Sequence, residues 1–243
     1  RYTDENLKQM MDSRVDSTRV VGQAIEQAAK PPPVWLQMST ATIYAHRFDA
    51  ANDEETGTIG GSEEGVPDYW SYSVQIAKKW EQTLDEAKTP NTRRIALRSA
   101  MVMSPDRGGI FDVMLSMVRR GLGGTAGDGT QFVSWIHVDD FIKAIHHLID
   151  SDMAGPVNLA SPGPLPYREF MAAFRNAWGT RIGLPATKWM LEVGAFFMRT
   201  DTELVLKSRR VVPGRLLDEG FQFAFDDWSK AATDLVARWR NEA

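Results

Sequence analysis

Cysteine is absent from this chain of 243 residues, which excludes disulfides, thiolate catalysis and cysteine-ligated metal sites. The same absence is typical of a cytoplasmic protein, and this is the location we expect. No window approaches the roughly 18 consecutive apolar residues of a membrane-spanning helix, so we expect no membrane association. The chain opens without a signal peptide or a methionine, just ahead of a helix. We therefore expect its natural beginning to be missing.

An excess of positive charge is absent as well. The formal net charge is −4, from 28 Lys and Arg against 32 Asp and Glu, and the basic residues form no long run. A surface that binds nucleic acid carries a basic footprint that this chain lacks. We therefore expect no nucleic acid as a partner.

Several familiar site motifs are also missing. The four histidines fall in no metal-binding spacing, so no metal site is predicted. No G-x-S-x-G sequence supports a hydrolase. The run Gly121–Gly129 contains neither G-x-G-x-x-G nor G-x-x-x-x-G-K followed by Ser or Thr. A flexible connection is the favoured interpretation of this run, although its backbone N–H groups remain available to an anion.

Strands and helices alternate through the first two thirds of the chain. Strands are expected at 34–44, 93–103, 132–137 and 157–160, and helices at 4–29, 70–88, 110–120 and 139–150. This alternation predicts an α/β fold with a doubly wound parallel sheet. The acidic, glycine-rich segment 45–68 is expected to be a mobile loop rather than a catalytic lid.

A helical tail punctuated by prolines follows residue 161. Its helices are expected at 166–178, 187–198, 202–208 and 227–240, as a smaller cap over the carboxyl edge of the sheet. Residues 1–104 with 132–160 would then form the sheet domain, and 105–131 with 161–243 the cap domain. The cleft between the two domains is the expected binding site.

The strand 34–44 carries the first candidates for a site. It begins apolar after three prolines and then reaches the hydroxyl residues Ser39, Thr40 and Thr42. Ligands of open α/β sheets bind at the carboxyl ends of the strands, so these hydroxyls lie where chemistry is expected. A strand that simply ends in a Ser/Thr turn is the alternative, and the spacing does not separate the two.

Two tyrosines, Tyr69 and Tyr72, stand at the start of the next predicted helix. A strand-end hydroxyl and a helix-borne phenol suit a carbonyl or alcohol redox site, where one holds the substrate oxygen and the other transfers its proton. The phenol has an ordinary pKa of about 10 and needs a nearby cation to act near neutrality. Four residues beyond these tyrosines stand Ser73 and Ile76, so that cation is missing.

His137 lies at a junction between a strand and a helix, in the sequence Trp135-Ile136-His137-Val138-Asp139-Asp140. Asp139 or Asp140 is a natural N-cap for the following helix. A structural role at this junction is favoured for His137 over a catalytic one.

Ordered matches through most of the chain resemble the extended short-chain dehydrogenase/reductase superfamily, in its atypical, sugar-nucleotide-epimerase-like branch with a C-terminal DUF1731-like domain. The matching segments are Ser13–Val15 with Thr18-Arg19, Ser39–Ala41 with Tyr44, Trp80-Glu81, Arg98–Val102, Gly108-Gly109, Gly121–Gly124 with Gly127, Gln131, Trp135–Asp140, Gly155–Leu159, Pro162, Phe170, Pro213, Leu216 and Gly220–Phe223.

The resemblance implies a Rossmann-like fold and a nicotinamide cofactor, with NADP favoured over NAD. It implies a nucleotide-sugar-like or other small carbonyl or alcohol substrate. It also places the glycine-rich loop that seats the cofactor pyrophosphate before Arg1, so this chain lacks that loop.

The superfamily's catalytic residues are Asn, Ser or Thr, Tyr and Lys. Carried over by position, they imply that Thr40 is the hydroxyl and Tyr72 the tyrosine, with Arg14 in place of the asparagine and Ile76 in place of the lysine. Arg14 would then supply some of the missing positive charge, although an arginine cannot relay a proton.

The resemblance also implies binding residues. The implied cofactor contacts are Met38, Ser39, Arg98, Ser99, Ala100 and Met101, and the implied substrate contacts are Thr42, Gly129, Gln131 and Trp135. For the last three residues, a tight turn followed by a core tryptophan is the equally supported alternative.

Two functions from different classes remain open. One is an NAD(P)-dependent oxidoreductase or epimerase, favoured by Thr40, Tyr72 and the block from Gln131 to Asp140. The other is a degenerate, non-catalytic member that senses nucleotides or binds proteins, favoured by the missing lysine and glycine loop. A homodimer through the outer faces of the helices at 4–29 and 70–88 is a further expectation, based on apolar residues such as Leu7 and Ile76.

Overall fold

The computed structural model describes residues 3–67, 69–185 and 206–241. The predicted helix 187–198 and most of the predicted helix 202–208 lie outside these residues. The elements are α1 (Asp4–Gln27), β1 (Val34–Thr40), the 3-10 turn η1 (Ala41–Ile43), α2 (Trp70–Asp85), β2 (Arg93–Ser99), β3 (Met101–Met103), α3 (Ile110–Arg119), β4 (Phe132–Val133), β5 (Trp135–His137), α4 (Val138–Asp150), β6 (Gly155–Leu159), β7 (Leu165–Pro166), α5 (Tyr167–Trp178), α8 (Gly214–Asp218) and α9 (Trp228–Asn241).

The strands β1, β2 and β6 form a parallel sheet in the order β1-β2-β6. Thr40 is in register with Ser99, and Ser99 with Leu159, so the three strands end at the same level. The predicted strand 93–103 is divided into β2 and β3 at Ala100, whose N–H donates to the Leu159 carbonyl. The second part, β3, pairs with β5 in a separate two-stranded sheet. The carboxyl ends of β1, β2 and β6 therefore lie along one edge of the sheet, the common carboxyl edge.

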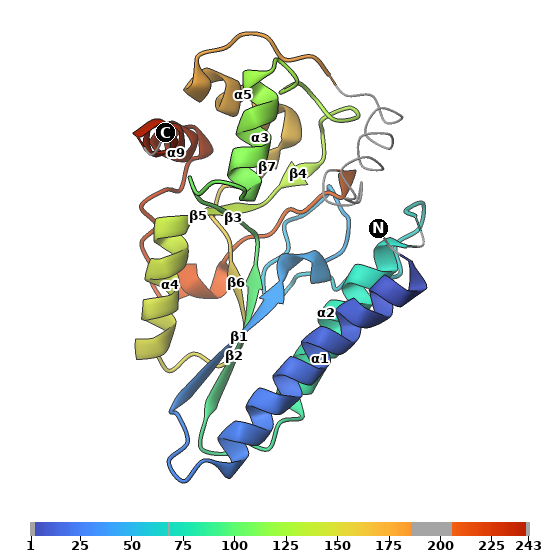
Figure 1. Cartoon of the computed structure of the whole chain (residues 1–243), viewed down its shortest axis with the longest axis vertical. Coiled ribbons are helices and arrows are strands. Elements are labelled where there is room, and N and C mark those ends of the chain that lie inside the picture. The colour runs from blue at the N-terminus through green and yellow to red at the C-terminus, as the bar shows by residue number, and fades with distance from the viewer. Residues whose placement is uncertain (1–2, 68, 186–205, 242–243) are drawn as a thin grey trace.

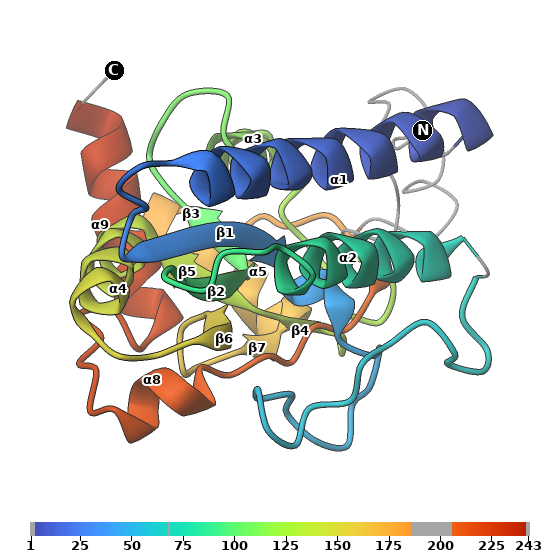
Figure 2. The ribbon, with the colours of Figure 1, turned by 90° about the horizontal axis from the view of Figure 1, so that it is seen from below.

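Helices cover both faces of this sheet, which confirms the doubly wound prediction (Figures 1 and 2). Side chains alternate along the strands. Trp35 of β1 and Ala96 of β2 pack with α1 and α2, whereas Ile95 and Leu97 of β2 pack with α4.

A second core lies beyond the carboxyl edge, among α3, α5 and α9 (Figure 1). It is aromatic: the rings of Phe170 and Trp228 stack 4.1 Å apart, and Trp135 lies 4.9 Å from Trp228. The short helix α8 was not predicted from the sequence. Its Leu216 packs with the residues of β2 and α4 in the core beside the sheet. The domain boundaries remain a prediction, but this packing places 214–223 with the sheet.

The described residues 45–67, expected to form a mobile loop, are fastened to the body of the protein. Asn52 is fully buried and forms backbone hydrogen bonds with Arg210 and Val212, and Glu54 accepts the N–H groups of Asn158 and Arg215. These anchors connect the segment to β6 and to the stretch 208–215.

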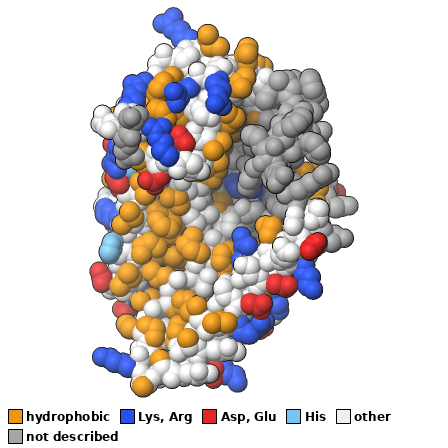
Figure 3. Space-filling model, in the orientation of Figure 1, with side chains coloured by type: hydrophobic (Ala, Val, Ile, Leu, Met, Phe, Trp, Pro, Cys, Tyr) orange, Lys and Arg blue, Asp and Glu red, His pale blue; other side chains and the backbone are white. Residues whose placement is uncertain are grey.

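Apolar side chains remain accessible on the face that carries α4 and β1 (Figure 3). Met38 of β1 is 38% exposed, and Ile142 and Ile149 of α4 are 50% and 44% exposed. Within the described ranges, β1 pairs with β2 alone. No helix in the described part of the chain is long and apolar enough to cross a membrane.

Candidate functional site

Thr40 is the last residue of β1 and lies half-buried at the common carboxyl edge. Its hydroxyl oxygen accepts the N–H of Thr42 at 3.1 Å and so caps the turn η1. A short side chain with an acceptor oxygen is what such a cap requires. The strand predicted at 34–44 ends earlier, at Thr40, so Thr40 lies at a strand end and Thr42 lies in the Ser/Thr turn that was the alternative.

Behind Thr40 lies a buried ion pair between β2 and α2. Arg98 donates from Nε to Glu81 Oε1 at 2.9 Å and from Nη2 to Oε2 at 2.7 Å. Ser39 Oγ donates to Glu81 Oε1 at 2.6 Å. Because a bidentate guanidinium–carboxylate pair is planar and directional, it fixes the spacing of β1, β2 and α2.

Tyr44 extends this network to β6. Arg98 Nη1 donates to the Tyr44 hydroxyl at 2.9 Å, and that hydroxyl donates to Asn158 Oδ1 at 2.9 Å. Burial raises the pKa of Tyr44, while the nearby Arg98 opposes that rise. The phenol is therefore protonated and committed to hydrogen bonds inside the protein.

The residues expected to bind the cofactor divide into two groups. The side chains of Ser39 and Arg98 are buried in the network above, and the cofactor contact expected of these two residues stays a prediction. Met38 is 38% exposed. Ser99, Ala100 and Met101 are half-buried at the strand edge, where Ser99 Oγ bonds the Ala100 carbonyl.

The structure does not gather Thr40, Tyr72 and Arg14 in one place. Tyr72 is 40% exposed and lines a groove between α1 and α2 with Leu7, Met11 and Ile76 among others. Arg14 lies 5.3 Å over the Trp80 ring and donates to the Met10 carbonyl. No contact in the described ranges links either residue to Thr40. The catalytic roles of Tyr72 and Arg14 stay predictions, and the structure does not show the closeness to Thr40 that the family resemblance implied.

The expected substrate contacts on either side of β4, namely Gly129, Gln131 and Trp135, are buried. Trp135 is fully buried and donates from Nε1 to the Gly163 carbonyl, and Gln131 is 4% exposed and donates to the Ala126 carbonyl. Gly129 is buried at a φ of +73°, with Arg168 Cβ 3.0 Å from where a Cβ would lie. The structure thus favours the alternative interpretation, a tight turn and a core tryptophan.

His137 has the structural role predicted for it. It is fully buried, its Nδ1 accepts the N–H of Asp139 at 3.1 Å, and its Nε2 lies 3.1 Å from Asp234 Oδ2. His137 itself is the N-cap of α4, whereas Asp140 accepts two N–H groups of the tail segment at Ala224 and Phe225. The expected aspartate cap is corrected accordingly.

Sequence reasoning missed two residues beside the η1 turn, His46 and Lys207. His46 Nδ1 accepts the N–H of Ser208 at 2.7 Å, and Lys207 Nζ donates to the Thr42 carbonyl at 3.3 Å. Lys207 is 2% exposed. No local sequence pattern indicates that the segment at 207–208 lies beside the loop after η1, because Lys207 follows His46 by 161 positions.

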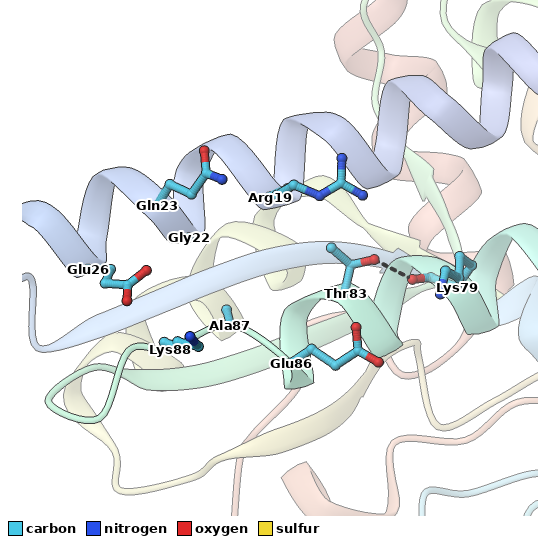
Figure 4. Close-up of a pocket in the computed structure, with 9 residues that line it drawn as sticks. All are labelled: Arg19, Gly22, Gln23, Glu26, Lys79, Thr83, Glu86, Ala87 and Lys88. Atoms are coloured by element: carbon cyan, nitrogen blue, oxygen red, sulfur yellow. Dashed lines mark hydrogen bonds between the residues drawn. The ribbon is translucent and has the colours of Figure 1, made fainter.

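A second groove lies between α1 and the C-terminal half of α2 (Figure 4). Its lining carries both signs of charge, from Arg19, Lys79 and Lys88 against Glu26 and Glu86. Such a mixed, solvent-exposed lining selects no particular charge, and the groove lies away from the carboxyl edge. Among the described residues no group of three metal-ligating side chains is assembled.

The comparisons with known families cover both parts of the chain. Residues 2–160 match the NAD dependent epimerase/dehydratase family, and residues 186–235 match a domain of unknown function, DUF1731. The human epimerase family protein SDR39U1 is 29% identical over 240 residues, which are 98% of this chain and 77% of that protein. Its bovine counterpart is 31% identical over 242 residues, with the same coverage of 98% and 77%.

Solved structures give the same picture. The crystal structure of human epimerase family protein SDR39U1 (isoform 2) with NADPH matches with a TM-score of 0.85 and 27% identity, over 98% of this chain and 76% of that one. A nucleoside-diphosphate sugar epimerase from Corynebacterium glutamicum matches with a TM-score of 0.72 and 22% identity, over 98% and 44%. The second likeness is one of fold.

Proposed function

The chain belongs to the NAD dependent epimerase/dehydratase family, and on this premise we propose that it is an NAD(P)-dependent oxidoreductase or epimerase of small carbonyl or alcohol substrates. The resemblance to atypical extended short-chain dehydrogenases and the Rossmann-like fold are thereby confirmed. The substrate itself is unassigned.

One observation carries the proposal. The half-buried hydroxyl of Thr40 stands at the edge where β1, β2 and β6 all end, next to the half-buried residues Ser99 and Ala100. Ligands of open α/β sheets bind at this edge. The network of Arg98 and Glu81 holds β1 and β2 in place behind that hydroxyl. Thr40 is therefore a fixed hydrogen-bonding group at the expected position of chemistry.

The residues at the edge fit the nicotinamide end of the cofactor. Met38 offers an exposed apolar surface on the strand that ends in Thr40, and both an apolar face and a hydroxyl suit a flat ring beside a substrate oxygen. No G-x-G-x-x-G sequence joins a strand to a helix in the described ranges, so no residue of this chain is assigned to the pyrophosphate. Bound cofactor would supply or accept the hydride.

The role of Thr40 in this proposal is to bind the substrate oxygen. Its hydroxyl accepts the Thr42 N–H and has its own proton left to donate. A donor placed where negative charge develops lowers the barrier to hydride transfer at a carbonyl. NADP is preferred over NAD in the proposal, since the human relative was solved with NADPH.

A thermal-unfolding titration of the full-length protein with NADPH and NADH tests cofactor binding. A ligand that binds only the folded state adds about 2.7 kcal/mol of stability at 100 times its Kd, so the midpoint should rise, and more with NADPH. Oxidation of NADPH by a panel of small aldehydes and ketones tests turnover. Thr40→Val should keep the midpoint shift and lose the turnover, whereas Thr40→Ser should keep both. No shift with either nucleotide at millimolar concentration contradicts the proposal.

A non-catalytic, nucleotide-sensing role is the second candidate. The positions of Tyr72 and Arg14 favour it, because neither residue contacts Thr40 in the described part of the chain. Cofactor binding without NADPH oxidation on any compound of the panel, or on nucleotide sugars, is the result expected of this role.

A further inference from the structure

We propose that a cavity at the amino ends of β1 and β2 binds an α-amino acid with an aliphatic side chain. The cavity measures about 460 Å³, within the range of roughly 300–1,000 Å³ for small-molecule sites. It is lined by the end of α1, by Pro31 and by the loop 88–92 that joins α2 to β2. Thr40 lies at the opposite end of β1, roughly 20 Å away at about 3.3 Å per residue (Figure 1). A ligand in this cavity would therefore not touch the site at Thr40.

Two opposite charges line this cavity. Glu26, in the last turn of α1, and Lys88, in the loop after α2, also line the adjoining groove of Figure 4. Among the described residues, neither of these side chains forms a hydrogen bond or an ion pair. The other charged residues of that groove have local partners three or four positions away: Arg19 pairs with Asp16, Lys79 donates to Gln82, and Glu86 accepts from Gln82. Glu26 and Lys88 are thus the charges left to a ligand.

The end of α1 favours a positive group beside Glu26. The carbonyl end of a helix carries partial negative charge, which a basic side chain in the last turn can offset. The end of α2 receives such a group from β2, because Arg94 donates to three backbone carbonyls within 84–87. The last turn of α1 contains no basic residue and holds the carboxylate of Glu26 instead. An ammonium group of a ligand would offset both the carboxylate and the helix end.

The lining also includes a buried hydroxyl, that of Thr89. This residue is 5% exposed, and its Oγ1 has no hydrogen-bond partner within the described ranges. A buried polar group without a partner is costly and uncommon in native proteins. The nearby Thr92 differs, since its Oγ1 donates to the Pro32 carbonyl at 2.8 Å. A ligand carboxylate beside Lys88 would accept the proton of the Thr89 hydroxyl.

Most of the remaining lining is apolar and rigid. Its apolar members are Ile25, Ala28, Ala29, Pro31 and Pro90. Proline fixes the backbone φ, and the hydrogen bond from Thr92 to Pro32 joins the two loops, so little conformational freedom is lost on binding. An aliphatic side chain suits these residues, while the ammonium and carboxylate of an α-amino acid suit the two charges. A simple anion or cation would leave one of the charges unpaired.

Titration with L-leucine tests the site, followed through the backbone amide resonances of Lys88, Thr89 and Asn91. Saturable shifts are expected from L-leucine, and weaker binding from glycine, which lacks the aliphatic side chain. Sodium acetate and isopentylamine hydrochloride each supply one of the two charges and should bind at least tenfold more weakly than L-leucine. Equal affinity for either of them overturns the proposed ligand class, and the absence of a saturable shift at millimolar L-leucine overturns the site.

Variants separate binding from folding, because Glu26 is exposed and lies at an unfavourable helix end. Without ligand, Glu26→Gln should slightly raise the unfolding midpoint, yet it should weaken L-leucine at least tenfold. Glu5→Gln, at the other end of α1, is the matched control and should leave the affinity unchanged. Lys88→Gln should also weaken L-leucine at least tenfold, whereas Lys79→Gln, which removes a lysine held by Gln82, should not. Unchanged affinity for L-leucine in both Glu26→Gln and Lys88→Gln would contradict the proposal.

Discussion

The two sides of Thr40 differ in how their polar groups are paired. Behind it, Arg98, Glu81 and Tyr44 satisfy one another through short hydrogen bonds in a buried network. In the loop that follows η1, the ring of His46 packs against Trp70, whose buried Nε1–H has no hydrogen-bond partner among the described residues. The first arrangement is a framework in which the polar groups satisfy one another, whereas the second leaves a buried donor unsatisfied. The difference marks Arg98, Glu81 and Tyr44 as the residues that hold the strand ends in place.

Removing Arg98 should produce the largest effect. Arg98→Met leaves the carboxylate of Glu81 buried without its cation, and breaking a buried pair in this way typically lowers stability by about 3–5 kcal/mol. Arg19→Met is the matched control, because its ion pair with Asp16 is exposed and such pairs contribute about 0–1 kcal/mol. Urea unfolding of both variants measures the two losses. Equal losses would remove the distinction between framework and surface.

Acidification should produce an intermediate effect through His137. Burial lowers its pKa, while Asp139 and Asp234 oppose this and Arg238 reinforces it. Below pH about 6.5, His137 is therefore protonated in the unfolded chain, while it remains neutral in the folded protein until a lower pH. Stability from this residue is complete above that pH and falls by at most about 1.4 kcal/mol per pH unit below it.

Urea unfolding at pH 7.5 and 5.5 measures this dependence. His137→Gln should have a lower free energy of unfolding than the unmodified protein at pH 7.5. Its free energy of unfolding should also change less between pH 7.5 and pH 5.5. The remainder is expected from His46, whose pKa is lowered in the same direction. An unchanged dependence in His137→Gln would show that the pKa of His137 is the same in the folded and unfolded states, against the account.

Tyr72→Phe should produce the smallest effect. The side chain is 40% exposed in the groove between α1 and α2, apart from both regions around Thr40. We expect NADPH binding and any turnover to stay within twofold of the unmodified protein, measured beside Thr40→Val. A loss as large as that of Thr40→Val would restore the catalytic role that the family pattern implied.

Sequence patterns predicted the sheet, most helices and the position of Thr40 at a strand end, because these depend on local periodicity and on where a strand ends. The same alternation could have placed Ser39 correctly: neighbours on a strand face opposite sides, so Ser39 faces Glu81 of α2 when Thr40 does not. For Tyr72, spacing along the helix did not reveal that its side chain lies against α1. Lys207 could not be found at all, since its contact with Thr42 spans 165 residues.

The same limit applies to the proposed homodimer. Leu7 and Ile76, chosen as outward apolar residues, are 8% and 6% exposed and line the groove between α1 and α2. Pairing of two chains stays a prediction, and the more exposed residues of α1, Val20 and Val21, are the better candidates for it.

Backbone amide NMR during titration with NADPH tests the central claim most directly, that the edge at Thr40 is the cofactor and substrate site. The amides of Thr40, Thr42 and Ser99 to Met101 should shift together and saturate with one affinity, while those lining the groove of Arg19 and Lys88 should not move. Shifts confined to that groove, or none at all on full-length protein, would contradict the claim.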